Sequence, residues 1–157
     1  MRKPLVNYRP PRPGDAEHVL RHLRAADLAE CQAAGHDPTD SLAHGLRHSL
    51  LAWTGTVDDE PALVMGCVPM GSLLSGVGVP WLLGTDLVPR HGRAFMRPAP
   101  RYIAEMLGMF PHLLNFVHAE NRVAVGWLRH MGFRIHEAAP YGPHGAMFHL
   151  FEAYRDV

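Results

Sequence analysis

Hydrophobic residues in the first third of the chain recur at the spacings of strands and helices. Residues 6–9 predict a short strand, which the two prolines that follow would stop. Apolar residues spaced three and four apart then predict a helix that begins with Asp15 as its N-cap. A second helix is predicted from Asp37, and its apolar residues lie four positions apart: Leu42, Leu46 and Leu50.

The middle of the chain changes to continuous apolar runs, which are typical of buried strands. We predict three strands here, over residues 53–57, 61–68 and 81–86. Asp58 and Asp59 form a turn between the first two. The run 62–65 contains no polar residue, so we expect this strand to be buried on both faces of a sheet. The segment 71–78 is rich in glycine and serine and predicts a flexible connection.

The second half of the chain alternates helices with strands. The segment 87–97 is basic and contains proline and glycine, which predicts a loop or the start of a helix. Pro98 and Pro100 disfavour a continuous helix through this point, and Gly132 is expected to end the last helix. The other predicted elements are helices over 102–110 and 121–131 and strands over 113–118, 133–138 and 146–151. This order predicts a mixed α/β fold in which residues 1–157 form a single domain.

Composition limits the classes of partner. The 157 residues are 47% hydrophobic and 19% charged, which favours a packed globular core. Basic and acidic residues number 15 each, so we expect neither nucleic acid nor an anionic membrane as the main partner. The stretch 61–85 has no charge, but its prolines and glycines indicate two buried strands and not a membrane span. The N-terminus lacks the apolar run of a signal peptide, so we expect a cytoplasmic location.

The cysteines and the paired histidines do not predict a metal site. Cys31 and Cys67 are too few for a disulfide framework, so we expect a reducing compartment and two thiols that pack as small apolar groups. Two histidine pairs have the four-residue helix spacing that can bind a metal: His18 with His22, and His44 with His48. No nearby cysteine or acidic residue completes a clear ligand set, and we therefore expect solvated helix faces.

A pattern near the end of the chain is similar to a helix-and-strand segment of the GNAT acyltransferase superfamily. The pattern is Asn121-x-x-Ala124-x-x-Trp127-Leu128-x-x-x-Gly132-Phe133. Upstream, Leu87-Val88-Pro89 resembles the end of the strand that precedes the superfamily's cofactor loop. The resemblance implies a mixed, mostly antiparallel sheet of about six to seven strands flanked by about four helices.

Four further patterns resemble a GNAT-like branch that contains the internal virion protein A of short-tailed phages. They are Arg24-x-x-Asp27-x-x-Glu30, Ala34-Gly35-x-x-Pro38, Leu114-Asn115-Phe116-Val117-x-x-x-Asn121 and Gly145-x-x-Phe148-x-Leu150-Phe151. This resemblance implies a phage or prophage origin, a place in the host cytoplasm or the virion, and other virion proteins as partners.

The superfamily resemblance implies transfer of an acetyl group from acetyl-CoA to an amine, on either a small molecule or a protein. The implied cofactor residues are Leu87, Val88, Arg90, His91, Gly92, Arg93, Ala94 and Asn121. The superfamily's phosphate loop, Arg/Gln-x-x-Gly-x-Gly/Ala, is degenerate here, because each register places a proline or a methionine at one of its defining positions. The arginines of this segment either bind phosphate instead or form a solvated basic face.

Three side chains are candidates for acid–base chemistry in such a transfer. Asp86 is the first candidate base, because a desolvated carboxylate at the end of the buried strand would have a raised pKa; its alternative role is to cap the next segment. Glu30 is the second candidate base, against a surface salt bridge. Leu128 stands where the superfamily has an acidic tyrosine, so Tyr141 is the candidate substitute, against a turn residue with a solvated hydroxyl. Asn121 either orients the cofactor or caps its helix.

Two functions of different class follow from these residues. The first is a GNAT-type N-acetyltransferase that uses acetyl-CoA, in which a main-chain N–H of the strand 81–86 stabilises the oxyanion. The second is a GNAT-shaped phage assembly protein that has lost catalysis and acts by binding virion proteins. The degenerate phosphate loop and Leu128 favour the second function.

Overall fold

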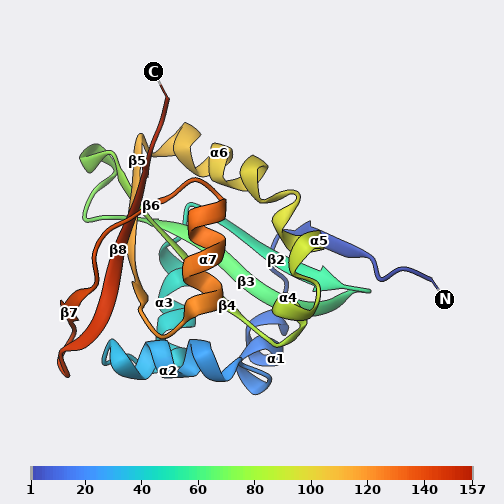
Figure 1. The fold of residues 1–157 in the computed structure, drawn as a ribbon. Coiled ribbons are helices and arrows are strands. Elements are labelled where there is room, and N and C mark those ends of the chain that lie inside the picture. Colours follow the sequence, from blue (N-terminus) through green and yellow to red (C-terminus); the bar gives the residue numbers. More distant parts are fainter. Residues whose placement is uncertain (1, 157) are drawn as a thin grey trace.

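A computed structural model describes residues 2–156, which form one eight-stranded sheet with helices on both faces (Figure 1). The strands follow the order β1-β2-β3-β4-β5-β8-β6, and β7 pairs with β8. Their bounds are β1 Val6–Arg9, β2 Leu51–Val57, β3 Glu60–Pro69, β4 Val77–Gly84, β5 His112–His118, β6 Arg134–Ile135, β7 Ala139–Tyr141 and β8 Ala146–Tyr154. Each pairing among these strands is antiparallel except that of β4 with β5.

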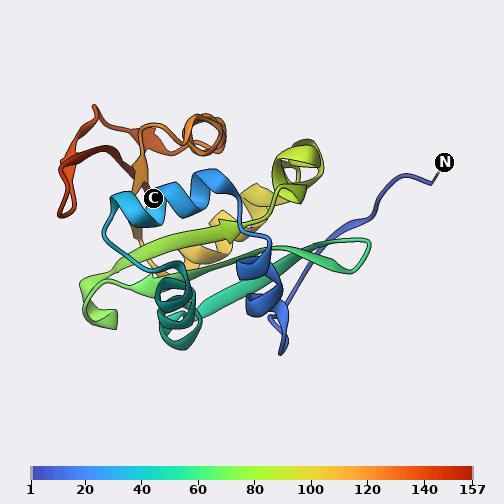
Figure 2. The same cartoon turned by 90° about the horizontal axis from the view of Figure 1, so that it is seen from below.

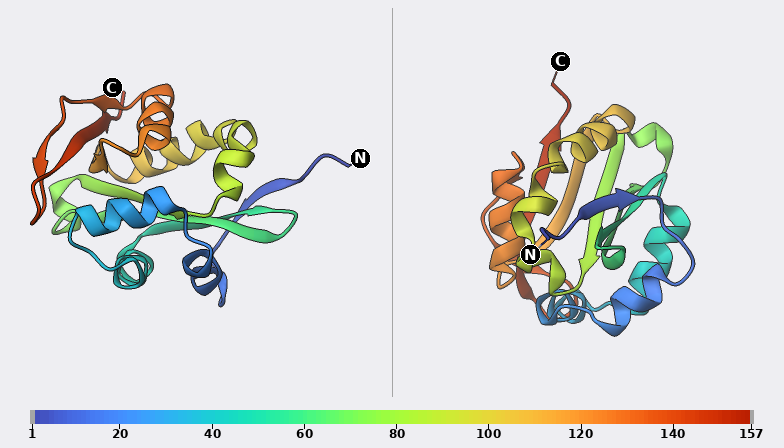
Figure 3. Two further views of the ribbon diagram at one scale, coloured as in Figure 1. Left: turned by 60° about the horizontal axis from the view of Figure 1, so that its bottom comes forward. Right: turned by 90° about the vertical axis from the view of Figure 1, so that its right-hand side faces the viewer.

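Two layers of helices cover this sheet. Figures 2 and 3 show α1 and α3 on one face and α5, α6 and α7 on the other, and α2 lies across the lower ends of β4 and β5 in Figure 1. The helices are α1 Asp15–Arg21, α2 Ala25–Ala33, α3 Pro38–His48, α4 Leu87–Arg90, α5 Gly92–Met96, α6 Ala99–Met109 and α7 Arg122–His130, with a 3₁₀ helix at Leu73–Ser75. The mixed, mostly antiparallel sheet expected from the sequence is confirmed, with more strands and more helices than expected.

β3 lies at the centre of the core. Its run 62–65 is buried on both faces, as the absence of polar residues predicts. Leu63 packs in one cluster with Phe95 of α5, whereas the next residue, Val64, packs on the opposite face with Val19 of α1. Because successive side chains of a strand point to opposite faces, one short run holds both helical layers against the sheet.

The helix expected from Asp15 consists of two helices, and the break between them lies beside the end of β4. Arg24 donates its main-chain N–H to the carbonyl of Gly84 at 2.9 Å, and Leu23 forms a β-bridge with Thr85. The helix ends here because these main-chain groups bond to a strand end. Helical spacing in the sequence does not reveal this partner.

Asp15 is the first residue of α1, and Gly14 is the N-cap, with a φ of 92°. The buried Asp15 carboxylate accepts hydrogen bonds from the Arg9 guanidinium at 2.7 and 3.0 Å, from the Thr54 hydroxyl at 2.7 Å and from the Arg12 main-chain N–H at 2.7 Å. Burial by itself raises the pKa of Asp15, but these donors outweigh burial and lower the pKa to about 2. The carboxylate therefore ties β1, β2 and α1 together.

We expect Asp15→Asn to lower the free energy of unfolding by about 2–3 kcal/mol at neutral pH. A lowered carboxylate pKa contributes stability above its unfolded value of about 4, and the contribution is lost as pH falls through about 2. Urea unfolding of both proteins between neutral and acid pH should show a difference that closes toward pH 2. Asp40→Asn, at an exposed position in α3, is the matched control. A difference that does not depend on pH would contradict this role of the ion pair.

The segment 87–97, predicted as a loop or helix start, contains the short helices α4 and α5. α6 begins at Ala99, earlier than the predicted 102, because a helix accepts Pro98 as its cap residue and Pro100 in its first turn. No helix within residues 2–156 is both long enough and apolar enough to cross a membrane.

The cysteines lie in the core as the sequence predicts, whereas of the paired histidines His18 is half-buried and His22, His44 and His48 are exposed. Both cysteines are free and buried, and burial raises the pKa of Cys31 to about 11 and that of Cys67 to about 12. In the two histidine pairs the rings are tilted by 47° and 46°, with centroids 4.7 and 4.4 Å apart. In the described part of the chain, no three His, Cys, Asp or Glu side chains form a cluster that could hold a metal ion.

Candidate active site between β4 and β5

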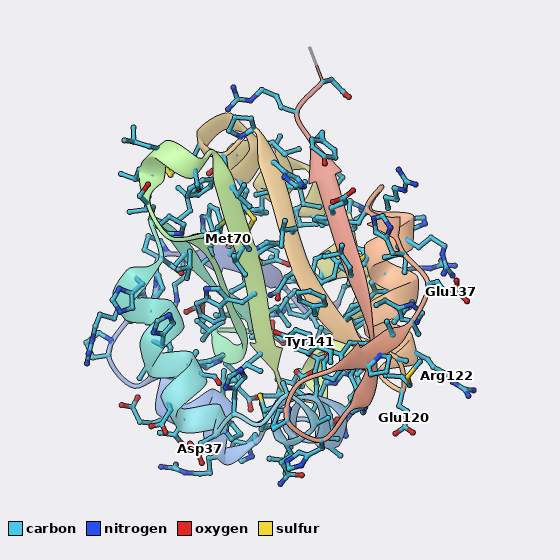
Figure 4. The ribbon with its side chains drawn as sticks, turned by 90° about the vertical axis from the view of Figure 1, so that its left-hand side faces the viewer. Asp37, Met70, Glu120, Arg122, Glu137 and Tyr141 are labelled. Carbon is cyan, nitrogen blue, oxygen red and sulfur yellow. The ribbon has the colours of Figure 1, made fainter. Side chains whose placement is uncertain are left out.

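The two central strands of the sheet diverge along their length. They pair in parallel at only two positions, Val77 with His112 and Gly78 with Leu113. The Asn115 side chain then donates a hydrogen bond to the carbonyl of Pro80 at 2.7 Å. Farther along, β4 pairs with β3 and β5 pairs with β8, and Figure 4 shows the two strands moving apart. The sheet is therefore open in its middle, and α2 crosses the wide end.

The main-chain groups of every second residue of β4 point into the gap between β4 and β5. Pro80 accepts the hydrogen bond from Asn115, and Gly84 donates its N–H to the Asp27 carboxylate at 2.8 Å, so both residues face away from β3. Leu82 lies midway between them, and the two-residue period of a strand gives its N–H the same direction. Leu82 thus presents a main-chain donor to the space between β4 and β5.

A first cavity, of about 190 Å³, lies between the diverging strands and the helices α5, α6 and α7. Most of its lining is apolar, and it includes Leu63, Phe95, Trp127 and Leu128. All three charged side chains that line it come from α2: Arg24, Asp27 and Glu30. An apolar cavity with a few convergent polar groups is the usual form of a small-molecule site.

The charged side chains of α2 form a buried cluster with the start of α7. Arg24 is 7% exposed and Asp27 is 4% exposed. The Arg24 guanidinium donates to Asn121 Oδ1 at 3.0 Å and lies 3.8 Å from Asp27 Oδ1. Asn121 Nδ2 in turn donates to Asp27 Oδ1 at 3.5 Å and to Glu30 Oε1 at 3.4 Å. Arg24, Asp27, Glu30 and Asn121 are called the polar cluster below.

The polar cluster joins the wide ends of the two strands. Asp27 holds the end of β4 through the N–H of Gly84, and Glu30 Oε1 holds the end of β5 by accepting from the N–H of His118 at 2.8 Å. Burial raises the pKa of Asp27, and it raises the pKa of Glu30 to about 7, with the neighbouring Asp27 charge adding to the effect. Near neutral pH, Glu30 therefore exchanges readily between acid and base forms.

A second cavity, of about 170 Å³, lies among residues of α2, α3, β4 and β5. Four residues line both cavities: Glu30, Trp81, Asn115 and Phe116. The two cavities are therefore neighbours, and the only ionisable side chain among these shared residues is that of Glu30.

The structure brings together two of the predicted site residues, Glu30 and Asn121. Glu30 is half-buried and belongs to the polar cluster, where its carboxylate accepts from His118 and Asn121 and makes no surface salt bridge. Asn121 occupies the N-cap position of α7, but its side chain makes no capping hydrogen bond. The interpretation of this side chain as a helix cap is wrong, because the polar cluster uses both its donor and its acceptor.

Of the other two predicted catalytic residues, Tyr141 shares the second cavity with Glu30, whereas Asp86 lines neither cavity. Asp86 is exposed, so the desolvation expected for it is wrong, and at the N-cap of α4 it makes no side-chain capping hydrogen bond. Tyr141 is the last residue of β7, and it is half-buried with its ring stacked on Phe116 at 4.2 Å between centroids. Tyr141 lines the second cavity, and Figure 4 shows it beside the diverging ends of β4 and β5.

The predicted cofactor residues that precede Asn121 lie on or between α4 and α5. Val88 is buried, whereas Arg90 and Arg93 are exposed on either side of Gly92. A Cβ at Gly92 would lie 3.3 Å from the Trp127 ring, so the start of α5 packs closely on α7. The remaining residues of this set are partly buried: Leu87, His91 and Ala94.

The N-terminus of α6 offers few free main-chain donors. Pro98 and Pro100 have no N–H, and the N–H of Arg101 is bonded to the carbonyl of Pro98 at 3.1 Å. A helix start normally presents several unpaired N–H groups that can bind phosphate. The degenerate pattern in the sequence therefore corresponds to a helix start that is poorly suited to this task.

The sequence predicted no chemical role for Arg24 or Asp27, and it predicted a main-chain donor in the strand 81–86 without singling out Leu82. Arg24 and Asp27 stand with Glu30 at a three-residue spacing, which was the available signal, but such a spacing also fits a solvated helix face. Leu82 contributes a main-chain group, so the type of its side chain carries no signal.

Several solved structures share this architecture. The GCN5-related N-acetyltransferase from Kribbella flavida matches with a TM-score of 0.66 and 19% identity, over 96% of this chain and 98% of that one. The chain has the GNAT fold. The ribosomal-protein-S18-alanine N-acetyltransferase from Escherichia coli matches with a TM-score of 0.65 and 13% identity, over 98% of this chain and 96% of that one. The aminoglycoside N(6')acetyltransferase from Legionella pneumophila matches with a TM-score of 0.64 and 13% identity, over 98% of this chain and 94% of that one.

The GNAT fold expected from the sequence is thereby confirmed over nearly the whole chain. No protein-family model matches the sequence, and no curated protein matches it either. Identities of 19% or less establish the GNAT fold alone. What the protein does must therefore be argued from the polar cluster and the two cavities.

Proposed function

We propose that the protein is a GNAT-type N-acyltransferase that moves an acetyl group from acetyl-CoA to an amine. The observation that supports this most directly is Glu30, a carboxyl with a pKa of about 7 that lines two neighbouring cavities. Acyl transfer to an amine needs such a base, because an alkylammonium has a pKa of about 10.4 and is not nucleophilic until it loses a proton. One cavity would hold the donor's thioester arm and the other the acceptor.

Two groups of the chain would perform the transfer. Glu30 accepts the proton of the acceptor ammonium, and its carboxylate is oriented by His118 and Asn121, which both donate to Oε1. The main-chain N–H of Leu82 donates to the thioester oxygen as negative charge develops on it. Both groups belong to a rigid framework, because β4 and β5 are held by the polar cluster.

The residues present fit the thioester arm of acetyl-CoA better than they fit its phosphates. When bound, acetyl-CoA supplies an activated acyl group. The apolar first cavity suits the pantetheine arm, and Arg90 and Arg93, exposed beside the start of α5, would hold the phosphates. Leu128 lines the cavity where an acid is expected, so a thiol of pKa about 8.5 leaves as the thiolate when the C–S bond breaks. The second proton of the attacking nitrogen passes to water as the amide forms.

A second function is a GNAT-shaped phage component that binds other virion proteins and no longer catalyses. One specific observation favours it. The start of α6 lacks free N–H groups for phosphate because of Pro98 and Pro100. The phage or prophage origin belongs to this second proposal and rests on the sequence patterns alone.

Calorimetric titration with acetyl-CoA separates the two functions. We expect a dissociation constant in the micromolar range, weakened about tenfold by Arg93→Ala, because a charge-assisted phosphate contact contributes about 1.5–3 kcal/mol. Arg47→Ala, exposed on α3 at the opposite face of the sheet, is the matched control and should bind as the wild type does. No detectable binding at millimolar acetyl-CoA would overturn acyl transfer and favour the virion component.

A further inference from the structure

The second cavity differs from the first in the side chains that recognise charge. Glu30 is the only carboxylate in its lining, and no lysine or arginine of the described residues lines it. The remaining polar side chains of the lining are Cys31, His36, Ser41, Asn115 and Tyr141. A ligand with a carboxylate or phosphate would find no strong partner here and would face the Glu30 carboxylate.

The polar cluster lacks one positive charge. It contains two carboxylates, Asp27 and Glu30, and one guanidinium, Arg24, which lies 3.8 Å from Asp27 and donates to Asn121. Both hydrogen bonds to Glu30 are accepted by Oε1, and none of the described residues donates to Oε2. Glu30 is half-buried and lines both cavities, so its Oε2 is available to pair with a cation there.

Aromatic rings form much of the cavity's remaining wall. Tyr141 stacks on Phe116 with an interplanar angle of 19°, and it lies 5.1 Å from Phe148 between ring centroids. Trp81 is fixed by its indole N–H, which donates to Ser49 at 2.8 Å. Aromatic faces attract organic cations and also pack on their apolar stems.

The nearest helix start does not provide an anion site. Asp37 caps α3 by accepting from the N–H groups of Thr39 at 2.9 Å and Asp40 at 3.2 Å. These N–H groups are therefore already paired, and the cap adds another negative charge close to His36 and Ser41. The electrostatic character of this end of the cavity is thus also unfavourable to anions.

The hairpin between β7 and β8 packs against the end of α2 beside the cavity. A Cβ at Gly35 would lie 2.5 Å from the Pro143 ring, and a Cβ at Gly142 would lie 3.1 Å from the carbonyl oxygen of Ala33. Glycine at both positions permits this close approach. The volume of about 170 Å³ suits a small molecule.

We propose that the second cavity is the acceptor site and that it takes a small primary alkyl- or arylalkylammonium without a carboxylate or phosphate. The ammonium pairs with Glu30 Oε2, and the apolar stem packs on Phe116 and Tyr141. The role of this cavity as the acceptor site rests on the proposed acyl transfer, but an ammonium would bind there without any acyl donor. The site therefore selects amines over amino acids by charge.

The test is binding of three probes without any acyl donor, by calorimetry or saturation-transfer NMR. The probes are 2-phenylethylammonium, phenylalanine, which adds a carboxylate, and 2-phenylethanol, which removes the charge. At about pH 8 the amine is protonated and Glu30 is ionised. We expect 2-phenylethylammonium to bind at least about tenfold more tightly than either analogue. This is the affinity that one charge-assisted hydrogen bond to Glu30 contributes.

Variants locate the binding. Glu30→Gln should remove the preference for the ammonium over 2-phenylethanol, and Tyr141→Leu should weaken ammonium binding about 2- to 30-fold. The matched controls are Glu137→Gln, at an exposed position labelled in Figure 4, and Tyr154→Leu, an exposed tyrosine at the end of β8 that stacks on His112. Both controls should bind as the wild type does.

The possible outcomes separate this inference from the proposed function. Equal binding of phenylalanine and 2-phenylethylammonium, or equal effects of Tyr141→Leu and Tyr154→Leu, would overturn the ammonium site. Acetyl transfer to amino acids or peptides with no ammonium binding would overturn it as well, and acyl transfer would stand. Selective ammonium binding without any acetyl-CoA binding would support the site and overturn acyl transfer.

Discussion

Replacing Glu30 with glutamine is expected to lower kcat/KM for acyl transfer by about 10²–10⁴-fold, the range that a general base typically contributes. Glutamine has nearly the same shape and can still accept from His118 and Asn121, but it cannot take a proton. In the wild type the rate should rise as pH increases through about 7, because burial raises the pKa of Glu30 to that value and only the carboxylate acts as a base. Steady-state kinetics on both sides of neutrality measure both effects.

Glu30→Gln lowers activity, but it should make the protein more stable than the wild type above neutral pH. A raised carboxyl pKa contributes stability below the unfolded value of 4.5, and this contribution is lost as pH rises through about 7. The wild type should therefore lose on the order of 3 kcal/mol of unfolding free energy relative to Glu30→Gln across that interval. Glu120→Gln, at an exposed position labelled in Figure 4, is the matched control. Full activity of Glu30→Gln with an unchanged pH profile would exclude Glu30 as the base.

Replacing Arg24 with methionine is expected to destabilise the protein by about 3–5 kcal/mol, because it leaves the buried Asp27 carboxylate and the neighbouring half-buried Glu30 without their cation. For a chain of this length, that loss lowers Tm by about 10–15 °C. Methionine keeps much of the apolar stem, so the effect reports chiefly on the charge. Arg24 also donates to Asn121, and the loss of this donor loosens the link between α2 and α7. Thermal unfolding followed by circular dichroism measures the change.

The pH dependence of this defect identifies its cause. Without the guanidinium, the pKa values of Asp27 and Glu30 rise further, so protonation at lower pH relieves the repulsion and the deficit of Arg24→Met shrinks. The double variant Arg24→Met/Asp27→Asn should recover part of the stability at neutral pH. Arg47→Met, exposed on α3, is the control and should change Tm little. A deficit that is equal at all pH values and unaffected by Asp27→Asn would point to packing instead of charge.

Local patterns predicted most of the fold correctly. The apolar run 62–65 is a strand buried on both faces, and Gly132 ends the last helix with a φ of 95°. The turn at Asp58 and Asp59 joins β2 to β3, and both residues have positive φ. These features depend on a few neighbouring residues, so the sequence reports them directly. The break between α1 and α2 was not predicted because it depends on bonds to Gly84, a residue distant in the sequence.

The candidate site was predicted only in part, and for a related reason. Glu30 and Asn121 were among the predicted residues, but the sequence favoured Asp86 as the base. Asp86 stands at the end of a buried strand in the sequence, yet its side chain is exposed in the fold. Whether a carboxylate is desolvated depends on what packs over it: Glu30 lies on α2 against His118 and Asn121, whereas Asp86 is in solvent.

By itself, the sequence determined the succession of strands and helices, the buried position of β3 and the resemblance to the GNAT fold, because these follow from local spacing and residue type. Only the tertiary structure decided that Glu30 meets Asn121, 91 residues away, at the end of two diverging strands. It also decided which carboxylate is buried and how the two cavities adjoin. The physical reason is that desolvation and long-range hydrogen bonding act between segments that are neighbours in space and not along the chain.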